Sequence, residues 1–226
     1  IQQYLDDPQA TSDLIDSVVQ ESQQFRCPKS AKLISEPVMV VGETETYDLN
    51  SLNSIDPSRL QPNITFKESI RKFSLKSLKT LESCLKKNVE SDKVAALIAE
   101  CVSVLDPTSH IEMLITIFVR TTAEQFKLML QSLIDLVPSE FLRSMLSLIV
   151  NREECQSQAF EMFRLLLITH KDPHHYNEDF SAFLTFFNKA ASHSEAMNLA
   201  LDVIKTCNPL QLAELQKALN SSRVLD

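Results

Sequence analysis

The sequence predicts a mainly α protein, in which a small α+β module is followed by an antiparallel array of α-helices, either an α-solenoid or a bundle. Hydrophobic residues make up 44% of the 226 residues, enough for a substantial core. Gly42 is the only glycine, whereas β-barrels, Rossmann crevices and P-loops each need several. From about residue 66 onward, apolar residues recur with helical spacing, which is absent between residues 25 and 65.

Residues 1–24 form the first of three expected regions, and we predict one short amphipathic helix over 11–24. A Thr-Ser-Asp start signal opens this segment at residue 11. The apolar residues that follow fall on one helical face: Leu14, Ile15, Val18 and Val19.

The second expected region, residues 25–73, mixes strand, loop and helix signals. Residues 25–65 hold four of the nine prolines and the only glycine. We expect a hairpin over 38–46, a short helix from Tyr47 to about Ile55, and an extended Gln-Pro-Asn before the next helix. The pattern Thr65-x-x-Glu68 resembles a capping box, which predicts a helix start at that point.

The third expected region, residues 74–226, reads as one helix after another, joined by short breaks at Pro, Asn or Asp. Two-helix units of roughly 40 residues fit the period of armadillo-like or HEAT-like repeats, although no repeat consensus is present. The first apolar stripes are Leu75, Leu78, Leu81 and Leu85, and then Val94, Leu97, Ile98, Cys101, Val102 and Leu105.

Charge and cysteine usage narrow the classes of function. The net charge of −8 disfavours nucleic-acid binding, and we interpret the lysines of segment 67–87 as solvated helix faces. Five cysteines without a Cys-x-x-Cys spacing indicate free thiols in a reducing compartment, cytoplasmic or nuclear. No apolar run is long enough for a membrane span.

Neither a catalytic residue nor a metal or cofactor site is expected. His170, His174 and His175 cluster in the sequence, but Pro173 breaks the helix that would align them as metal ligands. Free cysteines on apolar helix faces are usually small buried hydrophobes rather than nucleophiles. Two interpretations of the Met and Phe stripes remain open, core packing or a groove for a partner helix; the methionines are Met129, Met145, Met162 and Met197.

An ordered set of residues in the second region carries a family resemblance. Phe25-x-Cys27-Pro28-x-Ser30 is followed by Leu33-Ile34, Glu36-Pro37-Val38, Thr46-Tyr47-Asp48, Pro62-Asn63-Ile64 and Ile70. This order resembles the U-box, a zinc-free relative of the RING finger found in ubiquitin ligases. The resemblance covers about 50 of the 226 residues.

The resemblance implies a role for each matched residue. The structural core would comprise Cys27, Leu33, Ile34, Pro37, Val38, Tyr47 and Ile64, with Phe25 contributing to it. The surface for a ubiquitin-conjugating enzyme would comprise Phe25, Pro28, Lys29, Ser30 and Pro57. Cys27 would thus be structural and not a nucleophile.

Two departures from the U-box pattern leave two functions open. Lys29 stands where the family presents an apolar contact residue, and the span before Pro62 is shorter by roughly ten residues. One function is a U-box-type ubiquitin ligase, whose helical region binds a substrate or partner. The alternative is a non-catalytic scaffold with a degenerate U-box and a protein-binding helical domain. Pairing of two copies is compatible with either.

Overall fold

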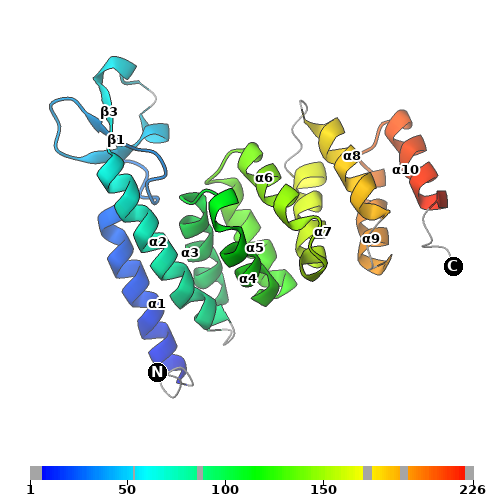
Figure 1. Ribbon diagram of the computed structural model, residues 1–226, viewed down its shortest axis with the longest axis horizontal. Helices are drawn as coiled ribbons and strands as arrows, with labels where there is room; N and C mark the ends of the chain where they lie inside the picture. The colour runs from blue at the N-terminus through cyan, green and yellow to red at the C-terminus, as the bar shows by residue number, and fades with distance from the viewer. Residues whose placement is uncertain (1–6, 53, 86–88, 170–174, 189–192, 222–226) are drawn as a thin grey trace. The chain divides into compact units, whose positions relative to one another are not determined.

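The computed structural model describes residues 7–52, 54–85, 89–169, 175–188 and 193–221. These residues form ten α-helices and one three-stranded sheet, which confirms the predicted mainly α class with a small α+β module (Figure 1). The chain divides into two compact units. Unit 1 comprises residues 1–110 and 131–136, and unit 2 comprises residues 111–130 and 137–226.

Unit 1 begins with α1, Pro8–Ser22, followed by a 3₁₀ turn, Gln23–Phe25. The Asp7 carboxylate accepts a hydrogen bond from the Gln9 N–H, and Pro8 occupies the first helical turn. This Asp-Pro start explains why the helix begins earlier than the predicted residue 11. Ile15 and Val18 are buried, and α1 packs along α2 (Figure 1).

The sheet of unit 1 has the order β2-β1-β3, with antiparallel pairs. The strands are β1, Pro37–Val40; β2, Thr46–Asp48; and β3, Leu60–Pro62. Val38 lies opposite Tyr47 on one side and opposite Pro62 on the other. The predicted hairpin is therefore present, and Gly42 in its connection adopts φ +93°, which favours glycine.

The short helix predicted from Tyr47 to about Ile55 is not observed. Tyr47 belongs to β2, and only a 3₁₀ turn, η3, Leu49–Ser51, follows it. Asp48 ends the strand because its carboxylate accepts the Asn50 N–H and so caps η3. A second 3₁₀ turn, η4, Pro57–Arg59, leads into β3.

The helix α2, Ile64–Leu85, begins just after β3. Asn63 caps it by accepting the Phe66 N–H, so the cap predicted at Thr65 lies two residues too late. The boundary expected between residues 73 and 74 lies inside α2, and the compact units divide elsewhere. Unit 1 also contains α3, Ser91–Ser103, which packs on α2, and a 3₁₀ turn, Thr108–His110.

Unit 2 contains the remaining helices, which follow one another along the chain (Figure 1). They are α4, Ile111–Arg120; α5, Ala123–Ile134, whose last residues belong to unit 1; α6, Ser139–Ile149; α7, Gln156–Arg164; α8, Tyr176–Phe187; α9, His193–Ile204; and α10, Pro209–Ser221. A 3₁₀ turn, Glu153–Cys155, precedes α7, and a π-helical turn, Leu165–Thr169, extends it.

An aromatic cluster forms the core of unit 2. Phe163 lies 5.7 Å from Phe183 and 5.4 Å from Phe186, measured between ring centroids, and Phe183 contacts Phe187. Met129, Met145 and Met162 are also fully buried, while Met197 is half-buried. The fully buried side chains fill the interior, as the core interpretation predicts.

Candidate functional site

The segment that resembles the start of a U-box folds into a tight loop, residues 27–32, which we call the 27–32 loop. An isolated bridge between Arg26 and Leu33 closes it, as does the hydrogen bond from the Cys27 N–H to the Lys32 carbonyl, 2.9 Å. The Ala31 N–H donates to the Cys27 carbonyl at 2.8 Å. Pro28, Lys29 and Ser30 are exposed at the tip of the loop.

Asp48 connects the 27–32 loop region to the sheet. Its carboxylate accepts hydrogen bonds from the Ser35 N–H, from the Ser35 hydroxyl and from the Asn50 N–H. Asp48 is buried, with 6% of the residue exposed. Because a carboxylate acceptor strengthens each bond, this cluster cross-links Ser35, strand β2 and η3.

Cys27 lies on the other side of the same cluster. The Asp48 N–H donates to the Cys27 Sγ at 3.4 Å, and the Ser51 hydroxyl lies 3.2 Å from that sulfur. Burial raises the pKa of the Cys27 thiol, but these bonds and the nearby Ser30 and Lys29 backbone outweigh it and lower the pKa to about 7. With 1% of its surface exposed, the sulfur serves as a hydrogen-bond acceptor in the interior and has little access to a substrate.

Most of the residues expected in the U-box-like core are buried, and Ile64 is the exception. Leu33, Ile34, Pro37, Val38 and Tyr47 are all buried.

Ile64 is 68% exposed, so its expected place in the core is wrong. It is the first residue of α2, and the core-facing stripe of this helix contains Phe66, Ile70 and Phe73. Two residues correspond to about 200° of helix rotation, which directs Ile64 away from that stripe.

Phe25, which the resemblance placed both in the core and on an expected surface for a conjugating enzyme, lies in the core. Only 9% of this residue is exposed, and its ring packs against Phe66 at 5.8 Å and against Phe73 at 5.0 Å. The two rings of α2 therefore cover the Phe25 ring, which is not available to a partner.

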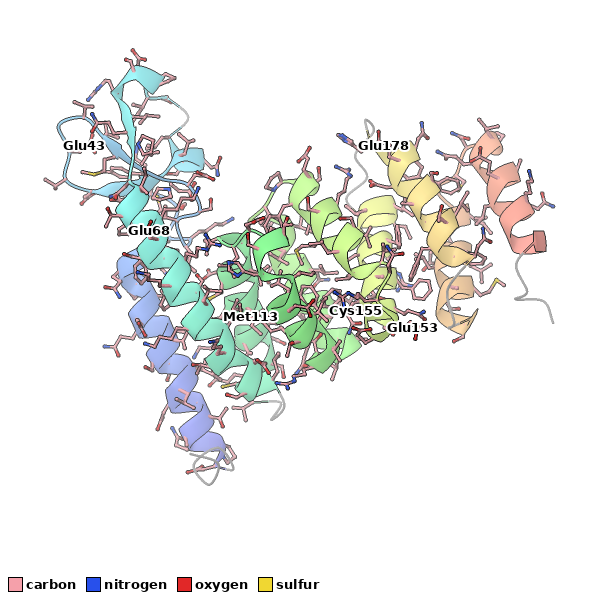
Figure 2. The ribbon with its side chains drawn as sticks, in the orientation of Figure 1. Glu43, Glu68, Met113, Glu153, Cys155 and Glu178 are labelled. Atoms are coloured by element: carbon pink, nitrogen blue, oxygen red, sulfur yellow. The ribbon has the colours of Figure 1, made fainter. Side chains whose placement is uncertain are left out.

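Lys29 occupies a defined position on the exposed tip. Its Nζ lies over the Tyr47 ring, 5.5 Å from the centroid, in a cation–π contact. The neighbouring carboxylates of Glu43 and Glu45 raise the pKa of Tyr47 well above its usual value, and Glu45 accepts a hydrogen bond from the Tyr47 hydroxyl at 2.9 Å. Glu43 lies in the connection between β1 and β2 (Figure 2). The exposed tip therefore presents a cation beside two carboxylates instead of an apolar residue.

Pro57 is exposed at the start of η4. It does not line the pocket that lies beside the 27–32 loop. This pocket has a volume of about 270 Å³. Ser30, Lys32, Asn50 and Ser51 are among its lining residues from the module, whereas Ser103, Asp135 and Leu136 line it from α3 and from the turn after α5. Sequence reasoning missed the latter three, because they lie far along the chain and match no motif.

The described residues contain no group of three His, Cys, Asp or Glu side chains placed to hold a metal ion. His170 and His174 lie outside the residues that the structure describes. Cys84, Cys101 and Cys155 are buried cysteines outside any disulfide, and burial raises the pKa of Cys101 to about 12 and that of Cys155 to about 11.

In the part of the chain that the structure describes, no single helix has the length and hydropathy to cross a membrane. One sharply bent pair, Ser91–Ser103 with Thr108–Arg120, meets these two criteria when its two segments are taken together.

Comparisons of the chain with protein-family models, with curated proteins and with solved structures find no match.

Proposed function

We propose that the chain acts as a U-box-type ubiquitin ligase, in which residues 25–73 hold a ubiquitin-conjugating enzyme and the helical residues 74–226 bind the substrate or partner. The observation that carries this proposal is the Asp48 cluster. A RING-like module without zinc needs another cross-link between its segments, and here the buried Asp48 carboxylate joins Ser35, β2 and η3.

The exposed tip of the 27–32 loop is the proposed docking element. Pro28, Lys29 and Ser30 are exposed in sequence positions that resemble the family's contact residues, while Cys27 holds the loop from inside. A ligase of this type performs no covalent chemistry. It would hold the charged conjugating enzyme near its substrate, so that proximity and orientation accelerate the transfer.

A titration of the ¹⁵N-labelled chain with a panel of conjugating enzymes tests docking directly. We expect chemical-shift changes concentrated at residues 28–32, and ubiquitin chain formation when activating enzyme, ATP and ubiquitin are added. A lysine in the contact position weakens an interface whose affinity depends on a few apolar residues. We therefore expect Lys29→Ile to tighten binding about tenfold, and the matched variant Lys72→Ile, at an exposed position on α2, to leave it unchanged.

The cation–π contact of Lys29 favours a second function, a non-catalytic scaffold. A lysine held over Tyr47 gives the tip a fixed polar surface, which suits a partner other than a conjugating enzyme. In that case neither the wild-type chain nor Lys29→Ile would form ubiquitin chains with any enzyme of the panel, and no shift changes would appear at residues 28–32. Chain formation by the wild-type protein would exclude the scaffold.

A further inference from the structure

We infer that Glu100 of α3 is a positioning residue for the 27–32 loop and acts on it through Arg26. The docking function of this loop rests on the function proposed above, whereas its positioning by Glu100 can be measured without any partner. Glu100 lies 74 residues from Arg26 in the sequence, in a helix that no part of the U-box resemblance covers.

The Arg26 guanidinium makes three hydrogen bonds that join the loop to α3. One nitrogen, Nη1, donates to the Ala31 carbonyl at 2.8 Å and to the Glu100 Oε1 at 3.0 Å. The other, Nη2, donates to the Glu100 Oε2 at 2.7 Å. Both side chains are about one-fifth exposed, 19% and 20%. Because Glu100 fixes the guanidinium plane with two bonds, the third bond to Ala31 has a fixed direction.

Ala31 is the residue of the loop that most needs such support. Its φ is +58°, a left-handed conformation that is unfavourable for a residue with a β-carbon. The hydrogen bond from Arg26 reaches the carbonyl of this residue, and the Ala31 N–H is bonded to Cys27. Strained conformations of this kind persist only where the surroundings hold them.

Two polar anchors connect the loop to the rest of unit 1, and the Arg26–Glu100 pair is the first of them. On the far side of the loop, the Lys32 Nζ donates to the Asp135 carbonyl at 2.9 Å. Beside this anchor lies the pocket of about 270 Å³, lined by Ser30 and Lys32 on one wall and by Ser103 and Leu136 on the other. Because this pocket separates part of the loop from α3 and the turn after α5, we infer that loss of the Arg26–Glu100 pair lets the loop shift.

Amide hydrogen exchange of the whole chain, followed by NMR, tests this inference. In Glu100→Ala, we expect protection of the Ala31 and Cys27 amides to fall about tenfold, since charged hydrogen bonds are lost. The amides of Leu49 and Asn63, bonded to Glu36 and Pro37 in the same module, should keep their protection. Glu100→Gln keeps the shape but not the charge, and we expect it to lose most of the protection too. A packing role would leave Glu100→Gln like the wild type.

The matched control is Glu21→Ala, which removes an exposed ion pair with Lys76 in the same unit and should change none of these amides. Equal loss of protection at all four amides, or no change at Ala31 and Cys27, would overturn the inference. A titration with a conjugating enzyme then separates it from the proposed function. Weaker binding by Glu100→Ala supports both, whereas faster exchange at the loop without any binding by the wild type supports positioning and rejects the docking function.

Discussion

Asp48 and Cys27 show how single residues hold the module together. Asp48 ends β2, caps η3 and bonds to Ser35, while Cys27 accepts a hydrogen bond from the Asp48 backbone. The sequence singles out Thr46-Tyr47-Asp48 because it matches the U-box pattern. It does not show that Asp48 ends a strand and does not begin a helix. That choice depends on the pairing of Tyr47 with Val38, which is a contact between two segments.

The low pKa of Cys27 predicts a pH-dependent free energy of unfolding. The thiol has a pKa of about 7 in the folded chain, against an ordinary value of 9.0. Between pH 7 and pH 9 the unfolded state therefore binds more protons, and the free energy of unfolding should rise with pH. We expect a gain of about 1 to 2 kcal/mol over this range, measured by urea denaturation at several pH values.

The variant Cys27→Ala provides the comparison for this prediction. Cys101 and Cys155 have raised pKa values, so they lower the free energy of unfolding at high pH in both proteins. The difference between wild type and Cys27→Ala removes that shared contribution. A difference that does not change between pH 7 and pH 9 would show that the Cys27 thiol keeps its ordinary pKa.

At the scale of elements, helices could be predicted from the sequence better than their ends. Apolar periodicity locates α2 and α3 because burial of one face determines helical structure. The ends depend on single capping side chains, and several residue types near an end can serve as the cap. Here Asp7 and Asn63 fill that role, and the pattern at Thr65 and Glu68 gave the wrong residue. The core position expected for Ile64 came from the U-box resemblance, and its place at the first turn of α2 leaves it exposed.

Substitutions at the start of α2 test which residue caps it. The Asn63 side chain accepts the Phe66 N–H at 3.1 Å and donates to the Thr46 hydroxyl at 3.0 Å. Asn63→Ala should lower the free energy of unfolding by about 1 to 2 kcal/mol, because it leaves the Phe66 N–H without its cap. Thr65→Ala, at an exposed position, should change it by less than about 0.5 kcal/mol. Urea denaturation of both variants measures the two values, and a larger effect at Thr65 would contradict the observed cap.

At the scale of the whole molecule, the fold class and the apolar core could be predicted, but the grouping of segments could not. Composition and spacing show that the Phe and Met stripes exist, and only packing shows that they meet in an interior. The division into units could not be predicted, since α2 crosses the expected boundary and residues 131–136 join unit 1. Such contacts connect residues about a hundred positions apart, for which one sequence contains no signal.

The same limit applies to the candidate site. Its tip at 28–30 follows from motif order, whereas Glu100 and Asp135 follow from the three-dimensional structure alone.

The aromatic core of unit 2 gives the last prediction. Phe163 is fully buried and its ring contacts Phe183 and Phe186. Phe163→Ala should lower the free energy of unfolding by about 3 to 5 kcal/mol, since it removes buried apolar area and leaves a cavity among rings that cannot collapse. Leu201→Ala, in α9 with the leucine 52% exposed, should cost less than about 0.5 kcal/mol. Urea denaturation followed by circular dichroism measures both. A cost near that of Leu201→Ala would show that Phe163 lies at a surface, and the interpretation of the Phe stripes as core would then fail.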